Sequence, residues 1–446
     1  MHEPLRLLRY NTGTDKQAFI KFKEHFDAVI FNATIVAYSG SAVADLVSVH
    51  KQKYIIDPQT HIFQHDISAI QSKSANKPKE IKASVIKYLE TMPQTLSDIV
   101  LKQKRAFLTN DISAVIPAFV ESTYKFETEF INGFIKKKEY DKYLDFAKIG
   151  PEPRLVIAPY FMIKKEYGDS EIREWLNINK QCLEQFIKYN NGKHPVSAQL
   201  VLDSEVLLYK DIFDLIKQYY HISGYEYIFI WVDNFNSFSA TSKEREGFFK
   251  LLEVFNDMNI KPLMAYGGFD SIFLCHNEIA NKIYGVSQSV GYGEAREITP
   301  VGGGIPVNKY YFLPTHQRIN FGSAAAILSD KEYFSKKKSN SHYAKMYYDN
   351  ICNCRQCKEI IKNDIDNFDL YNESTPFQMR GVMRNRPTTN ASLISAMHFL
   401  WCKVHEWQSI REKSLAELKK DLLSGVKLYA PHLTDTITEW CNQYVK

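Results

Sequence analysis

Three cysteines fall within six residues late in the chain, and their spacing suits the binding of a metal ion. The run from Cys352 through Cys354 to Cys357 reads C-x-C-x-x-C, so one tight turn can bring three thiolates to a single ion. A tetrahedral site needs a fourth donor. The candidates for it are His342, His398, Cys402 and His405. We favour His398 because it begins a helix-like run that can pack against the cysteine loop.

Three thiolates and one imidazole complete a tetrahedron and leave no open position for water, which is typical of a structural zinc site. The sequence therefore predicts structural Zn2+ held by Cys352, Cys354, Cys357 and His398. The alternative, buried thiols beside a helical histidine, explains the clustering less well. Seven cysteines in 446 residues do not form an extracellular disulfide framework, so we expect a reducing, cytoplasmic location.

Aspartates at the ends of short apolar runs are the second set of residues that could do chemistry. Asp57, Asp203 and Asp233 each close such a run, and enzymes built on barrels place their catalytic groups at the carboxyl ends of strands. Paired carboxylates can share the work of nucleophile and acid or base. Asp57 is the firmest candidate, and its alternative role is that of a turn or helix-capping residue beside Pro58.

The elements that would position these residues alternate between apolar, β-rich runs and helical patterns. We expect strands over Ala28–Tyr38, Lys53–Asp57, Leu155–Ile163, Val196–Asp203, Tyr227–Asp233, Ile260–Tyr266, Lys282–Ser287 and Lys309–Leu313. Between them, helices are expected over Glu171–Tyr189, Leu207–Tyr220, Lys243–Met258 and Ser271–Asn281. Eight such repeats without a glycine-rich fingerprint after the first strand predict an α/β fold, a closed (β/α)8 TIM barrel.

The predicted organisation has two parts. Residues 1–345 form the barrel, with a helical insertion at about 58–153 that we expect to cap the strand ends. Residues 346–446 form a zinc-binding subdomain after the eighth strand, with helices over Ser392–Lys413 and Leu415–Ser424. Polar residues interrupt the longest apolar stretch, so no membrane span or secretory signal is expected. The net charge of +5 is mild, and the lysine triplets at 136–138 and 336–338 are solvated loop charges or contacts for a polyanion.

The cysteine motif followed by a histidine helix resembles the zinc site of the tRNA-guanine transglycosylase superfamily. The interval between Cys357 and His398 is longer than the family's usual gap, which implies an extra loop. Matches along the barrel follow in the family's order: the small-residue turn Ala37–Val43, then Tyr54–Asp57, Leu200–Asp203, Trp231–Asp233, Ala265–Phe269, Tyr284–Val286 and Phe312–His316. The chain departs from the pattern at Tyr310, where the family has its nucleophilic aspartate, and at Pro58-Gln59-Thr60, which replaces a Ser-Gly-Gly-Phe-Gln loop.

The resemblance implies exchange of guanine in a nucleic acid for a 7-deazaguanine base, with Asp57 and Asp233 as catalytic carboxylates. The residues expected at the substrate are Asp203 on the purine edge, Gly267 and Gly268 against the flat base, and His316 and Arg318 at a phosphate. Either Asp203 or Asp233 could be the second catalytic carboxylate, and the other would then contact the purine edge. The target nucleotide must leave its stack and lie between aromatic side chains, which make up 13% of the chain.

The nucleic acid is expected to be DNA, because the motifs diverge, the insertion is long and no extra RNA-binding domain is evident. A tRNA enzyme of the queuosine or archaeosine type is the first alternative. A non-catalytic transglycosylase-like subunit that binds nucleic acid is the second, and Tyr310 in the nucleophile position supports it. The sequence leaves both homo-oligomers and hetero-oligomers open.

Overall fold

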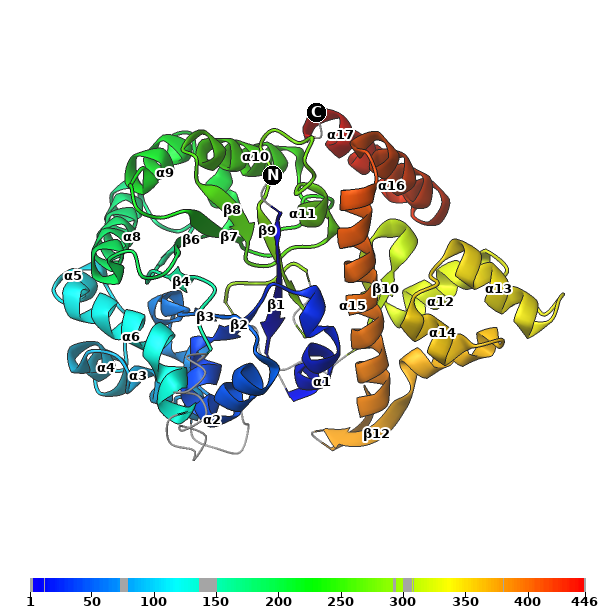
Figure 1. The fold of residues 1–446 in the computed structure, drawn as a ribbon, viewed down its shortest axis with the longest axis horizontal. Helices are drawn as coiled ribbons and strands as arrows, with labels where there is room; N and C mark the ends of the chain where they lie inside the picture. The colour runs from blue at the N-terminus through cyan, green and yellow to red at the C-terminus, as the bar shows by residue number, and fades with distance from the viewer. Residues whose placement is uncertain are drawn as a thin grey trace.

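Parallel strands form a nearly closed barrel of eight positions, surrounded by helices, in the computed structural model (Figure 1). The structure describes residues 3–11, 13–72, 79–135, 151–291, 294–299, 307, 309–379 and 381–444. The barrel strands are β1 (Leu5–Tyr10), β2 (Ala28–Asn32), β3 (Tyr54–Asp57), β4 (Val156–Ile157) with β5 (Met162–Ile163), β6 (Val196–Leu202), β7 (Tyr227–Val232), β8 (Lys261–Met264) and β9 (Gly285–Ser289). The predicted TIM-barrel class is confirmed.

Closure of the barrel depends on β1 and on the short strands β4 and β5. Strand β1 pairs with β2 on one side and with β9 on the other, while β4 and β5 both pair with β6. Between β3 and β4, the amide of Arg154 donates to the carbonyl of Tyr54 at 2.7 Å. These parallel strands are buried on both faces, as expected for a barrel covered by helices.

The prediction of eight barrel strands includes one that does not belong to the barrel and misses one that does. Strand β1 was not predicted, because Arg6 and Arg9 interrupt its apolar pattern; Arg9 is nevertheless fully buried. The run at Lys309–Leu313 is not the eighth barrel strand, since β10 (Lys309–Phe312) pairs antiparallel with β11 (Gln317–Asn320) in a separate hairpin. The last barrel strand is therefore β9.

The first predicted strand is too long, because helix α2 (Ala33–His50) begins directly after Asn32. The small-residue stretch that resembled a turn therefore lies inside this helix, which kinks at Ser39. A side chain at Gly40 would collide with the ring of Phe134, 2.3 Å from the nearest ring carbon. Small residues are needed here for close packing between helices rather than for a turn.

Helices fill the outer ring in the order of the repeats. They are α1 (Gly13–Phe22), α8 (Asp169–Asn190), α9 (Ile212–Tyr220), α10 (Ser242–Asp257) and α11 (Phe269–Phe273), of which α11 is much shorter than predicted. The insertion contributes α3 (Ala83–Leu89), α4 (Gln94–Leu101), α5 (Thr109–Ser113) and α6 (Ile116–Ile135). Helix α6 packs between α2 and α8, so this helix of the insertion is part of the outer ring. The lysine triplet at 136–138 lies outside the described residues.

Helix α15 (Thr389–Glu412) joins the C-terminal part to the barrel and stands between them in Figure 1. It packs on α1 and α11 of the barrel and on β10 and α14 of the C-terminal part. The other elements are α12 (Phe321–Asp330), α13 (Asn340–Asn350), α14 (Arg355–Ile361), the hairpin β12 (Ser374–Met379) and β13 (Val382–Pro387), α16 (Leu415–Tyr429) and α17 (Thr434–Tyr444). In the described part of the chain, each helix is too short or too polar to cross a bilayer.

Candidate metal centre and barrel mouth

The four predicted metal ligands converge in the structure. The ligand atoms of Cys352, Cys354, Cys357 and His398 all lie within 4.8 Å of one another. Cys354 caps helix α14 and Cys357 lies in its first turn, so the turn brings their sulfurs within 3.4 and 3.3 Å of His398 Nδ1. His398 does not begin a helix as expected but lies in the middle of α15, which starts after Thr388.

Contacts around His398 orient its ring for metal binding. Its Nε2 lies 2.8 Å from the carbonyl oxygen of Tyr311, an acceptor that places the ring proton on Nε2 and leaves Nδ1 free to face the thiols. The side chains are buried, except that Cys354 is half-buried. Three soft sulfur donors and one imidazole nitrogen at these distances fit a metal ion with tetrahedral coordination.

Of the other candidates for the fourth ligand, only Cys402 lies beside the cluster. His342 and His405 are exposed to solvent, whereas Cys402, one turn after His398, has its sulfur 3.9 Å from Cys352 Sγ and 3.7 Å from His398 Nδ1. Tyr310 stacks on His398 with ring centroids 4.4 Å apart. Tyr310 therefore lines the metal centre.

Asp57 lies at the carboxyl end of β3, where it is fully buried inside the barrel mouth. Its Oδ2 accepts a hydrogen bond from Arg9 Nη1 at 2.8 Å in a completely buried ion pair. Its Oδ1 accepts from the hydroxyl of Tyr160 at 2.6 Å and from the amide of Gln59 at 3.2 Å. These donors stabilise the ionised carboxylate.

Arg9 links Asp57 to three other strands. Its Nε donates to the carbonyl of Ala265 at 3.1 Å and to Ser287 Oγ at 3.2 Å, and its Nη1 also contacts Asn32 Oδ1. Burial opposes the charge of Arg9, but the adjacent Tyr266 and Asp57 outweigh it and raise the pKa of the guanidinium. Through these hydrogen bonds the ion pair connects several strands across the barrel interior. It also places polar groups at the barrel mouth.

Asp203 and Asp233 follow β6 and β7 and lie close enough to interact. Burial, reinforced by the charge of Asp233, raises the pKa of Asp203, although the amide of Lys165 donates to its Oδ2 at 2.8 Å and opposes the shift. Asp233 Oδ1 accepts from the amide of Ile298 at 2.6 Å. The barrel mouth therefore carries carboxylates from three strand ends, and burial raises the pKa of one of them, Asp203.

The expected base-binding glycines have packing roles in the structure. A side chain at Gly267 would meet Val286 Cγ1 at 2.7 Å, so the close approach of this turn to β9 requires glycine. Gly268 precedes helix α11, and a side chain there would come within 3.4 Å of Glu294 Cβ.

The two residues expected at a phosphate are engaged between the hairpin and neighbouring elements. His316 stacks on Phe269 at 3.5 Å and contacts Glu406 Oε1 at 2.7 Å. Arg318 donates to the carbonyl of Val290 at 2.6 Å and lies over the ring of Phe399. Both side chains therefore make their polar and ring contacts with other residues of the protein.

Sequence reasoning missed His61, which is buried at the mouth with neither ring nitrogen hydrogen-bonded among the described residues. It stacks on Tyr160 at 5.4 Å and meets Trp231 edge to face at 5.3 Å. Burial, followed by the charge of His65, holds the pKa of His61 well below its ordinary value, so the ring is neutral. The only sequence signal for it was its place four residues after Asp57.

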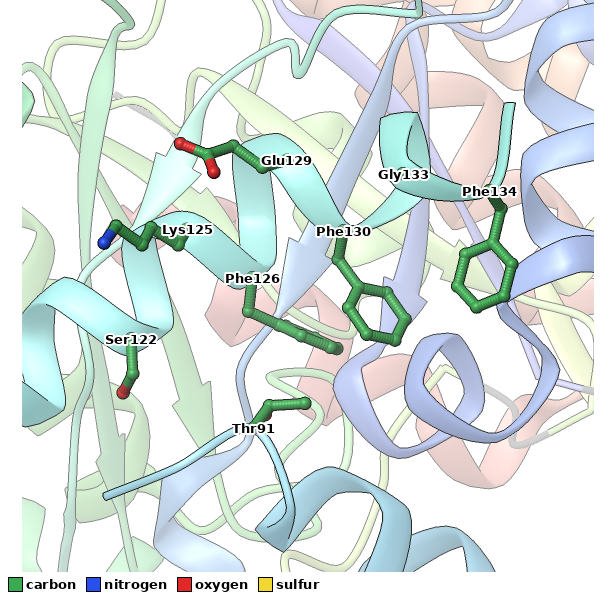
Figure 2. A pocket seen from close by; sticks show the side chains of 8 residues that line it. All are labelled: Thr91, Ser122, Lys125, Phe126, Glu129, Phe130, Gly133 and Phe134. Carbon is green, nitrogen blue, oxygen red and sulfur yellow. The ribbon is translucent and has the colours of Figure 1, made fainter. Parts of the chain in front are cut away.

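A separate surface groove lies on the insertion, where the rings of Phe126, Phe130 and Phe134 project from α6 beside Thr91 (Figure 2). It shares no lining residue with the metal centre or with the carboxylates of the mouth.

Comparison of the sequence with protein-family models gave no match, and comparison with curated proteins gave no significant relative.

Proposed function

We propose that the protein is a pentosyltransferase that exchanges guanine in a nucleic acid, preferably DNA, for a 7-deazaguanine base. The observation that carries this proposal is the presence of Asp57, Asp203 and Asp233 at three strand ends of one barrel mouth. This is the end at which barrel enzymes assemble catalytic groups. The aromatic rings of Trp231 and Tyr266, whose centroids lie 4.7 Å apart, offer faces on which an unstacked base can pack.

The proposed reaction proceeds by two displacements at C1′ of the target nucleotide. A carboxylate, Asp233 or Asp57, attacks C1′, the bond to guanine N9 breaks, and guanine leaves with a proton supplied by an acid group. The incoming 7-deazaguanine then loses its N9 proton, attacks C1′ and releases the carboxylate. Asp203 suits the proton transfers because burial raises its pKa.

Asp233 is the better nucleophile of the two aspartates. Asp57 is held by Arg9 and Tyr160 through both carboxylate oxygens, so attack by it would break a buried ion pair. Asp233 is half-buried and lies beside Asp203. Asp57 would then orient the aromatic pocket through Tyr160.

A structural Zn2+ ion is part of the proposal, held by Cys352, Cys354, Cys357 and His398. When bound, it would neutralise the thiolates and fasten the cysteine turn to α15, which also packs on the barrel. We assign it no part in the chemistry.

A non-catalytic subunit that binds nucleic acid is the second candidate, and the position of Tyr310 favours it. In the family pattern this position carries the nucleophile, but here its side chain is fully buried against His398. A protein of this kind would retain the barrel and metal centre without base exchange.

The decisive experiment measures incorporation of radiolabelled 7-deazaguanine into duplex DNA, single-stranded DNA and tRNA. We expect incorporation into DNA and a denaturation-resistant protein–DNA adduct, both lost in Asp233→Asn. The matched control is Asp257→Asn, because Asp257 is exposed at the end of α10, at the opposite end of the barrel.

Incorporation into tRNA alone would replace the DNA proposal with the tRNA enzyme. Binding of either polymer without exchange or adduct would favour the non-catalytic subunit. Loss of the adduct in Asp57→Asn but not in Asp233→Asn, with both variants folded, would transfer the nucleophile to Asp57.

A further inference from the structure

The barrel mouth is closed by the chain itself, through residues Glu294–Thr299 that follow the last barrel strand. Ile298 is only 1% exposed and belongs to the apolar cluster that fills the barrel interior. Its amide donates to Asp233 Oδ1 at 2.6 Å. At one end, Glu294 forms an ion pair with Lys403 of α15, and at the other, Thr299 Oγ1 lies 3.4 Å from His65 Nδ1. We call Glu294–Thr299 the plug.

Arg296 is the plug residue that meets the aromatic side chains of the mouth. Its guanidinium carbon lies 5.6 Å from the ring centroid of Trp231 and 5.2 Å from that of Tyr266. Its Nη1 donates to the hydroxyl of Tyr266, and its carbonyl accepts from Trp231 Nε1 at 3.1 Å. A flat guanidinium packs on aromatic faces much as a heterocycle does, and its N–C(N)–N unit recurs in the amino-pyrimidinone edge of guanine.

Buried polar atoms near this contact lack partners. Arg9 Nη2 and both ring nitrogens of His61 are buried without a hydrogen bond among the described residues. His61 touches Trp231, and Arg9 lies 4.5 Å from the ring of Tyr266, so all of these groups border one region. A buried donor without an acceptor is costly, and a ligand that brings a carbonyl oxygen and ring N–H groups would supply the missing partners.

We propose that Trp231, Tyr266, Arg9 and His61 form a binding site for a planar heterocycle carrying a carbonyl group, and that Arg296 occupies this site as a substitute ligand. Binding of the base then requires displacement of the plug. This inference rests on the proposed function and adds to it the residues that hold the base and a mechanism that keeps the empty site closed.

The test measures binding of free guanine and free 7-deazaguanine by calorimetry to the full chain and to Arg296→Ala. Because the closed plug lowers the fraction of competent protein, we expect Arg296→Ala to bind about tenfold more tightly than the wild type. The matched control, Arg384→Ala in the exposed strand β13, should bind as the wild type does. Hydrogen–deuterium exchange of peptides covering 294–299 should become faster in the wild type when the base saturates the site.

Equal affinity of wild type and Arg296→Ala, or slower exchange of the plug on binding, would overturn the inference. If the wild type exchanges bases in DNA but neither protein binds the free base, the assigned pocket is wrong while the proposed function stands. If Arg296→Ala binds the base tightly but no nucleic acid undergoes exchange, the pocket stands and the proposed function falls.

Discussion

The barrel mouth and the metal centre are both buried and polar, but they balance their charges in different ways. At the mouth, Asp57 is paired with Arg9 at 2.8 Å, so a cation and an anion of the protein satisfy each other. At the candidate metal centre, three sulfurs and one imidazole lie within 4.8 Å of one another, and a bound metal ion would have to neutralise the thiolates. The barrel should therefore fold without a ligand, whereas the C-terminal part should not.

Metal removal should have the largest effect. It should destabilise the C-terminal part and leave the barrel folded. Binding of structural zinc contributes about 10–16 kcal/mol in small zinc domains. We therefore expect chelation, or the substitution Cys354→Ser, to expose residues around 346–412 to protease and to hydrogen exchange while the barrel strands remain protected. Metal content by mass spectrometry should fall from one zinc per chain to none. A metal-free protein with an equally protected C-terminal part would show that the thiols need no ion.

Breaking the ion pair of the mouth should have the next largest effect, on stability of the barrel. Asp57→Ala leaves the guanidinium of Arg9 buried without its counter-charge, at a cost of about 3–5 kcal/mol in urea unfolding. The double variant Arg9→Met with Asp57→Leu should recover part of this loss. The matched control is Glu90→Ala, which breaks the exposed pair with Lys87 and should cost less than about 1 kcal/mol. Similar losses at both pairs would mean that burial of the first pair is unimportant.

Glu127 extends the comparison of the two buried sites to a carboxyl group that forms no ion pair among the described residues. It is buried on α6, where its Oε2 accepts from the amide of Ile157 at 2.8 Å and its Oε1 has no partner among the described residues. Burial raises its pKa well above the ordinary value, against the opposing effect of the Ile157 amide.

A raised carboxyl pKa stabilises the folded state below the unfolded pKa, and this contribution is lost as pH rises through the folded pKa. Wild-type stability should therefore fall relative to Glu127→Gln by about 1.4 kcal/mol for each pH unit between the ordinary carboxyl pKa and the raised folded pKa, and should level off above the folded pKa. Urea midpoints measured from pH 5 to pH 10 check this, with Glu129→Gln, exposed on the same helix, as control. A pH-independent difference would show that folding does not raise the pKa of Glu127.

The sequence predicted the convergence of the four candidate metal ligands well because their chemistry is local. Cys352, Cys354 and Cys357 are close in sequence, so any compact conformation of their loop brings the sulfurs together, and only His398 had to be selected from a distance. The ends of β3, β6 and β7 were likewise readable, since buried parallel strands are nearly continuous apolar runs. A strand with two arginines did not fit that pattern, and β1 was missed for this reason.

Sequence alone thus determined an α/β chain with three clustered cysteines suited to a metal ion and with aspartates at strand ends, because each of these features depends on residues that are close together in the sequence. Only the tertiary structure decided that Arg9 from β1 neutralises Asp57 from β3, that Tyr310 lines the metal centre, and that Arg296 packs on Trp231 and Tyr266. These contacts join segments far apart in the chain. Their energies depend on burial and mutual geometry, which spacing along a sequence does not encode.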